Sequence, residues 1–182
     1  MSIFGFGMAH KVQVRHYRRA KALLDGCGRP YCLNVSTATH EGTRLDGEFA
    51  VAYEDISAIF NRQTQFLGYL ADPAIATVLS QASLRVAFFD EGVRANNTTV
   101  LGAMAAGCPV LTNLDEWSPA GFIHGDTVLD IAQCTTIYFH SADDLEELGV
   151  RGRRLVEERY SWPKLIAMLG QAMNPIGITG ST

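Results

Sequence analysis

Segments with the composition of short β-strands alternate with amphipathic helical segments along most of this chain. The predicted strands are residues 2–6, 30–36, 64–70, 84–89, 109–113, 127–132 and 135–140, and the predicted helices are residues 10–26, 51–61, 72–82, 97–107 and 141–160. Strands joined by helical crossovers run parallel, and right-handed crossovers place helices on both faces of the sheet. The alternation therefore predicts an α/β fold built on a doubly wound parallel sheet.

Two helix starts carry specific capping signals. Asp72 followed by Pro73 is typical of an N-cap residue and a first helical residue. Ser141 with Asp144 three positions later is a second predicted cap. The run at 84–89 is continuous and apolar, which is typical of a strand that is buried on both faces of its sheet.

One domain, residues 1–173, is expected to account for nearly the whole chain of 182 residues. A final helix is predicted after Ser161, and residues 174–182 are expected to form a frayed or disordered tail. No apolar run approaches the roughly 18 residues that can span a bilayer. The first residues also lack the pattern of a signal peptide, so the cytoplasm is the expected location.

The formal net charge of −4 argues against a nucleic-acid-binding protein, which needs a basic surface. The cations nevertheless gather near the start of the chain, at Lys11, Arg15, Arg18, Arg19, Lys21 and Arg29. Two interpretations stay open. The cluster is either a solvated helix face or a basic surface that meets an anionic ligand, a lipid or a partner.

The four cysteines have neither the paired spacing of a redox motif nor that of a zinc site. We expect buried free thiols, because an unpaired cysteine behaves as a small hydrophobic side chain. The five histidines form no metal-binding pair, and no metal motif is present. The sequence therefore predicts no metal site.

Polar residues cluster where the predicted strand 84–89 ends and the next helix begins. In an open parallel sheet, ligands bind beyond the carboxyl ends of the strands. A helix start there presents free backbone N–H groups and a partial positive charge, which together favour anions. The residues that add donors or charge at this place are Arg94, Asn96, Asn97, Thr98 and Thr99. Capping explains one of them, and anion binding explains the group.

A second candidate for phosphate binding follows the first predicted strand. Gly5 and Gly7 permit a close approach of the backbone to a ligand, and Lys11 adds a cation one helical turn later. The pattern is neither the dinucleotide-binding G-x-G-x-x-G motif nor a P-loop, because His10 stands where the third glycine would be. Two strand ends that both favour anions suggest a ligand with a diphosphate.

The sequence resembles the C-terminal, donor-binding half of retaining glycosyltransferases with the two-domain GT-B fold. "LGAMAAGCPVLTN" at 101–113 is similar to the "LEAMAxGxPVVxS" segment of the group 1, family 4-like enzymes. "FLGYLADPAIATVLSQASLRVAFF", "RRLVEERYSWPKLIAML" and "IFGFGMAHK" look like the elements before it, the closing helices and the first phosphate-facing loop. The resemblance spans most of residues 3–170 and implies a Rossmann-like domain that binds a nucleotide sugar.

The chain departs from this pattern at two positions that are glutamates in many of these enzymes. Aligned on the segment at 103–105, the two positions hold Arg94 and Gly102. In the enzymes that this chain resembles, those glutamates are associated with the donor sugar and the ribose, so neither contact carries over to Arg94 and Gly102. Glu91 is the nearest acidic residue and is the sequence's candidate for a catalytic carboxylate.

The resemblance implies that the chain is the donor half of a glycosyltransferase, acting with an acceptor-binding N-terminal domain that this sequence lacks. Alone it would bind a nucleotide sugar without turning it over, in polysaccharide or glycoconjugate biosynthesis. No cofactor or metal is expected, and the full protein could associate peripherally with the inner face of the membrane. The alternatives are a non-enzymatic nucleotide or phosphosugar-binding module and an epimerase-like sugar-nucleotide enzyme.

The loop at 115–119 is expected on the same side of the sheet, because it follows the predicted strand 109–113. It is interpreted either as a plain connection or as a lid over the donor sugar. The sequence specifies neither the base and sugar of the donor nor the acceptor.

Overall fold

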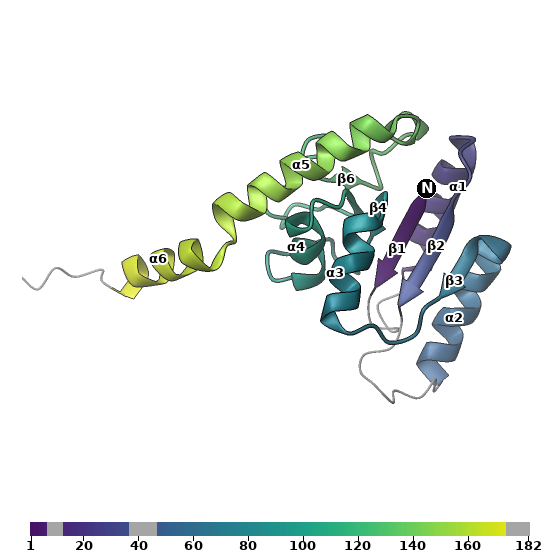
Figure 1. Ribbon diagram of the computed structural model, residues 1–182, viewed down its shortest axis with the longest axis horizontal. Helices are drawn as coiled ribbons and strands as arrows, with labels where there is room; N and C mark the ends of the chain where they lie inside the picture. Colours follow the sequence, from purple (N-terminus) through teal and green to yellow (C-terminus); the bar gives the residue numbers. More distant parts are fainter. Residues whose placement is uncertain (7–12, 37–46, 174–182) are drawn as a thin grey trace, which may run out of the picture.

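The computed structural model describes residues 1–6, 13–36 and 47–173. These residues form a six-stranded sheet in which all of the paired neighbours are parallel, in the order β3-β2-β1-β4-β5-β6. The strands are β1 (Ser2–Phe6), β2 (Cys32–Ser36), β3 (Thr64–Phe66), β4 (Leu84–Val86), β5 (Val110–Thr112) and β6 (Leu129–Asp130). The predicted doubly wound parallel sheet is confirmed (Figure 1).

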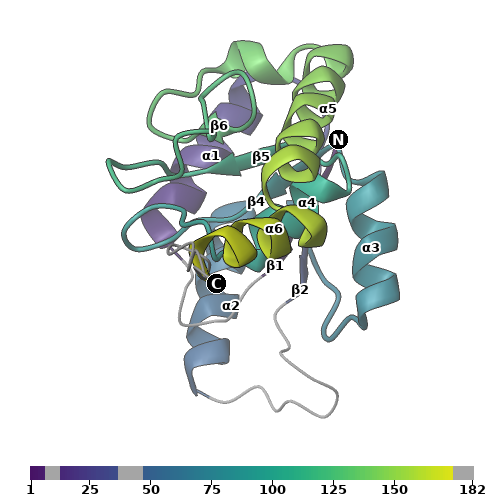
Figure 2. The ribbon, with the colours of Figure 1, turned by 90° about the vertical axis from the view of Figure 1, so that its left-hand side faces the viewer.

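Helices cover both faces of this sheet. They are α1 (Val14–Gly26), α2 (Gly47–Phe60), α3 (Asp72–Gln81), α4 (Thr98–Ala105), α5 (Ala142–Arg159) and α6 (Trp162–Met173), with 3-10 turns η2 (Asn61–Gln63) and η3 (Thr136–Phe139). Figure 2 shows α1 and α3 on opposite sides of the strands. The layers are thus those of a sheet between two helical layers.

The two faces of the sheet carry two separate hydrophobic cores. Neighbouring residues of β1 point to opposite faces, so Ile3 packs with α1 and α2 whereas Phe4 packs with α3 and α4. Helix α5 contributes to both cores, because Leu148 lies in the first and Leu155 in the second. Helix α6 lies away from the sheet (Figure 1), and its Ile166 side chain is 64% exposed.

Several predicted elements are shorter than expected or of another type. The predicted strand at 135–140 is wrong, since residues 136–139 form the 3-10 turn η3. Its Phe139 is buried in the first core while Ile137 is 66% exposed, and the turn packs against α1 and α5 instead of extending the sheet. β-branched residues favour strands only where strand neighbours exist to pack on.

The two predicted caps have different outcomes. The Ser141 cap is confirmed, because its Oγ accepts a hydrogen bond from the Asp144 backbone N–H at 3.2 Å. At the other helix the N-cap position is Ala71, and Asp72 is already the first helical residue. The carboxylate of Asp72 still lies in the first turn, where the helix dipole favours negative charge.

The cysteines are free, as predicted, but only two of them are buried. Cys108 and Cys134 lie in the two cores, whereas Cys27 and Cys32 are half-buried. Burial raises the pKa of the Cys108 and Cys134 thiols to about 12. These two thiols are therefore packing residues, in keeping with their hydrophobic surroundings.

Candidate functional site

The strand order reverses between β1 and β4, which lie side by side at the centre of the sheet. The connection after β1 runs over one face and the connection before β4 over the other, as the two cores show. Such a switch point leaves a crevice at the carboxyl ends of the two strands, where ligands bind in this class of fold. The topology therefore identifies the segments that follow β1 and β4 as the candidate ligand-binding site.

The starts of α1 and of the β4–α4 loop lie next to each other at this edge. The side-chain amide of Gln13 donates a hydrogen bond to the Asp90 carboxylate. The His16 ring lies 5.3 Å from the ring of Phe88, which follows β4. Burial against this ring and the charge of Arg15 lower the pKa of His16, so the imidazole is biased toward its neutral form at the edge of the sheet. The first residues of α1 thus contact the start of the β4–α4 loop.

Gly7 and Lys11, two of the predicted phosphate-binding residues, lie outside the described residues. Gly5 lies in β1, between Val35 of β2 and Val86 of β4. A Cβ added at Gly5 would lie 3.5 Å from the Tyr17 hydroxyl, which is an ordinary packing distance. The packing of α1 on the central strand therefore does not by itself require a glycine at position 5.

Arg94 is held in a forked ion pair with Asp115 from the loop after β5. Its Nη1 and Nη2 atoms each donate to one carboxylate oxygen at 2.7 Å. Both side chains are 29% exposed. Such bidentate geometry fixes orientation as well as charge. The guanidinium that was predicted to meet phosphate therefore already has a carboxylate partner in this structure.

Asn97 occupies the N-cap position of α4, but its side chain does not cap the helix. Its Oδ1 atom instead accepts a hydrogen bond from the Arg94 backbone N–H at 2.5 Å and closes the turn before the helix. Asn96 and Thr98 are exposed, and Thr99 is half-buried. The first backbone N–H groups of α4 therefore make no hydrogen bond to the Asn97 side chain.

The turn before Arg94 depends on Gly92. Its φ of +81° is a left-handed conformation that favours glycine. A Cβ added there would lie 2.8 Å from Cγ of Asp115, so a larger residue would displace the ion pair. Glu91, the candidate carboxylate, is exposed immediately before this turn. Its charge acts on Arg94, which places it beside the ion pair.

Asp115 also organises its own loop. Its Oδ1 atom accepts from the backbone N–H of Trp117 at 3.0 Å and from the Ser118 hydroxyl at 3.1 Å. One carboxylate therefore joins the β4–α4 loop to the loop after β5. The Asn113 side chain adds a second link, because it exchanges two hydrogen bonds of 2.8 Å with the backbone of Phe89.

The Arg94–Asp115 pair predicts how acid should affect this loop. Hydrogen bonding from Arg94 holds the pKa of Asp115 below its usual value of 3.8. A depressed folded-state pKa stabilises the fold above the unfolded value, and the contribution is lost as the pH falls through the folded value. We therefore expect the loop to stay ordered down to about pH 4 and to loosen only below 3.8.

Fluorescence anisotropy of Trp117, in a Trp162→Phe background that leaves one tryptophan, measures this loosening. The Asp115→Asn variant is the control, since it lacks the titrating group and should show a mobile loop across the whole pH range. If the loop with Asp115 intact were already fully loosened well above pH 3.8, the role of the ion pair would be contradicted.

Three residues that the sequence did not single out also shape this part of the sheet. Arg85 lies within a run predicted to be apolar, yet its side chain is 1% exposed and donates from Nη1 to the Phe4 carbonyl at 3.3 Å. Burial lowers its pKa to about 10. Asp130, 3% exposed, accepts from the Leu114 backbone N–H. Arg85 could have been singled out from the sequence, because it is the one charged residue in its apolar run. Nothing in the sequence distinguishes Asn113 and Asp130.

Three cations of the basic cluster near the start of the chain have partners within the domain. Arg19 donates to the Ile131 carbonyl at 2.5 Å, and Arg29 donates to the Phe139 carbonyl at 3.0 Å. Lys21 pairs with Asp25 at 2.6 Å. Arg15 and Arg18 remain exposed on α1, and they are the described cations to which either interpretation of the cluster still applies.

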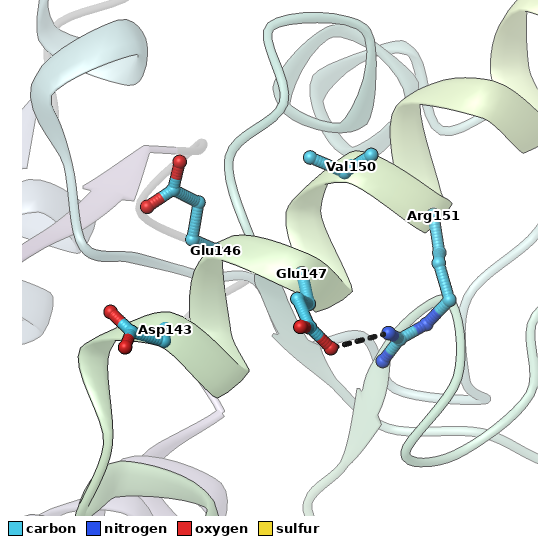
Figure 3. A pocket seen from close by; sticks show the side chains of 5 residues that line it. All are labelled: Asp143, Glu146, Glu147, Val150 and Arg151. Atoms are coloured by element: carbon cyan, nitrogen blue, oxygen red, sulfur yellow. Dashed lines mark ion pairs between the residues drawn. The ribbon is translucent and has the colours of Figure 1, made fainter.

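A shallow depression of about 320 Å³ lies on the first half of α5 (Figure 3). It is lined by Asp143, Glu146, Glu147, Val150 and Arg151. Arg151 pairs with Glu147 at 3.5 Å and with Asp126 at 3.1 Å, so its charge secures the loop beside the helix. The start of α5 follows η3 at the amino edge, so the depression does not belong to the carboxyl-edge site.

Within the described ranges, no three His, Cys, Asp or Glu side chains are grouped closely enough to hold a metal ion. In the same residues, no helix combines the length and the apolar character needed to cross a membrane.

Neither the protein-family models nor the curated proteins that were searched match this sequence. Solved structures match its fold. HepE of Anabaena, crystallised with UDP-glucose, aligns with a TM-score of 0.70 at 13% identity, over 96% of this chain and 49% of that protein. Sucrose-phosphate synthase of Thermosynechococcus elongatus aligns with a TM-score of 0.68 at 17% identity, over 94% of this chain and 44% of the synthase.

The C-terminal domain of the group 1 glycosyl transferase LpcC of Francisella tularensis aligns with a TM-score of 0.62 at 16% identity. That alignment covers 88% of this chain and 85% of that domain. The present chain thus spans about half the length of the two larger proteins and most of the separate domain. The resemblance to the C-terminal half of the GT-B fold is confirmed at the level of fold.

Proposed function

We propose that this domain binds a nucleotide sugar and serves as the donor half of a glycosyltransferase. One observation carries the proposal: the start of α1 and the loop that leads into α4 meet at the carboxyl edge of the switch point, where Gln13 donates a hydrogen bond to Asp90. Two helix starts at one edge supply backbone N–H donors and positive potential for a diphosphate. HepE, which shares the fold, is crystallised with UDP and with UDP-glucose.

In this proposal the diphosphate lies at the start of α4, near Thr98 and Thr99, with Lys11 as its cation. Protein cations and helix dipoles stabilise the leaving diphosphate, and no metal takes part. Arg94 serves by fixing the loop through Asp115, while Glu91 is the carboxylate available to a sugar hydroxyl. The acceptor is held by another domain of a longer cytoplasmic protein, so the chain alone binds the donor without turning it over.

Calorimetric titration with UDP, GDP, ADP and dTDP tests the proposal. We expect one of them to bind, and Lys11→Ala to weaken that binding by roughly 1–3 kcal/mol, the scale of a hydrogen bond to a charged group. Lys21→Ala is the matched control, because Lys21 lies on the body of α1 and pairs with Asp25 of the same helix and with Gln63 of η2. Absence of heat with all four nucleotides at millimolar concentration would contradict the proposal.

A non-enzymatic nucleotide-binding module is the second candidate. It is favoured by the residues at the two positions where many glycosyltransferases of this pattern have glutamates. Arg94 is occupied by Asp115, and Gly102 is an exposed glycine without a carboxylate. Sugar-nucleotide turnover by the longer protein, measured with and without acceptor, separates the two candidates.

A further inference from the structure

Trp117 is exposed at the carboxyl edge of the sheet. Its side chain is 72% exposed, whereas tryptophan is among the largest apolar side chains and is highly buried on average. The residue follows β5 in the loop that Asp115 ties to the β4–α4 loop. An exposed indole beside a ligand-binding edge is a feature that packing of the domain does not explain.

The loop that presents this indole is fixed by several hydrogen bonds. Asp115 receives the fork of Arg94 and accepts from the backbone N–H of Trp117. The backbone N–H of Asp115 in turn donates to the Ser118 hydroxyl at 3.0 Å. These hydrogen bonds thus preorganise the loop in one conformation. Preorganisation lowers the entropic cost of binding a ligand on the indole.

The charges around the indole select the chemistry of that ligand. Glu91 and Glu116 are exposed beside the loop, and the neighbouring cation Arg94 is neutralised by Asp115. An acidic surface repels phosphate but offers carboxylate oxygens that accept hydrogen bonds from hydroxyl groups. A flat apolar face packs well on an indole. A neutral ring with one apolar face and many hydroxyl groups satisfies both conditions.

We propose that Trp117 is the stacking platform of a carbohydrate-binding surface, with Glu91 and Glu116 as acceptors for its hydroxyl groups. The inference rests on the proposed function, because it places the sugar next to the diphosphate site at the start of α4. The ring belongs either to the donor nucleotide sugar or to a separate saccharide acceptor. Both sources share the same chemistry, and the experiment distinguishes them.

The experiment measures binding of the four nucleoside diphosphates, their glucose esters and a panel of free hexoses to the wild type and to Trp117→Ala. If the ring is that of the donor, Trp117→Ala weakens binding of the glucose ester roughly tenfold, the scale of one lost aromatic contact, and leaves the nucleoside diphosphate unaffected. If the ring is a separate saccharide, the variant loses hexose binding instead. Trp117→Phe should restore part of either loss.

Ile137→Ala is the matched control, because it removes another exposed apolar side chain, 66% exposed in η3, far from the carboxyl edge. It should change none of these affinities. Both variants alter exposed side chains, so the melting temperature verifies that they are folded. In a Trp162→Phe background, the emission of Trp117 should shift with the sugar-bearing ligand and stay constant with the diphosphate.

Equal affinity of the wild type and Trp117→Ala for every ligand overturns this inference while leaving nucleotide binding in place. An equal loss for the diphosphate and its glucose ester also overturns it, because Trp117 would then act on the nucleotide. Wild-type protein that binds neither nucleotides nor hexoses overturns both this inference and the proposed function.

Discussion

Gly149→Ala is expected to lower the free energy of unfolding by roughly 3 kcal/mol, the upper part of the range for overpacking a core. Gly149 lies in α5, where a Cβ would be 2.1 Å from the carbonyl oxygen of Gly107 and 3.2 Å from Pro109. The first contact is with backbone, which no side-chain rotation relieves. Helices α4 and α5 would have to separate, and the melting temperature should fall by roughly 6–12 °C.

Gly102→Ala is the matched control for this prediction. It makes the same substitution within a helix, but a Cβ at Gly102 would meet nothing within 4 Å. Alanine is the better helix former, so this variant should gain roughly 0.5–1 kcal/mol. Chemical denaturation of both variants compares them directly. A gain of stability in Gly149→Ala would show that the α4–α5 contact is looser than the structure has it.

Gly92→Ala is the second change with a large expected effect, of roughly 2–3 kcal/mol, which combines a strained backbone with overpacking. The added methyl group would meet Asp115 at a place where Arg94, Trp117 and Ser118 also hold that carboxylate. Relief of the clash requires Asp115 to leave the ion pair. We therefore expect a local result as well, with lower Trp117 anisotropy in a Trp162→Phe background.

Gly28→Ala separates the two components of that effect. Gly28 also has a positive φ, of +69°, but a Cβ there would have open space around it. This variant should lose only the backbone component, about 1–2 kcal/mol, and leave the Trp117 anisotropy unchanged. If Gly92→Ala and Gly28→Ala were equally destabilised, and both kept an ordered loop, the contact with Asp115 would be without consequence.

The outline of the fold follows from local sequence signals. The apolar spacing of α3 and α4, the cap at Ser141 and the run at 84–89 are properties of short segments, and the structure contains an element at each place. Local signals suffice here because amphipathic helices and buried strands must satisfy their own periodicity wherever they pack. The lengths of the strands were less predictable, since β4 covers only Leu84–Val86 of its apolar run.

The candidate site was predictable in position but not in its contacts. The alternation of strands and helices alone places the β4–α4 segment at the carboxyl edge of the sheet. Arg94 and Asp115 are 21 positions apart in the chain, and no local pattern pairs them. The partner of a cation in a loop depends on which loops the strand order of the sheet brings together. Arg94 was predicted to bind phosphate, and in the structure it pairs with the Asp115 carboxylate.

The sequence by itself determined the alternating elements, the parallel sheet and the edge at which polar residues gather. Only the tertiary structure decided that Phe139 lies in a 3-10 turn and not in a strand, and that Arg85 is buried. It also decided that Asp115 joins the β4–α4 loop to the loop that carries the exposed Trp117. The physical reason is the range of the interactions. Periodicity and capping act within a few residues, whereas burial and ion pairing depend on neighbours that are adjacent only after β5 has paired with β4.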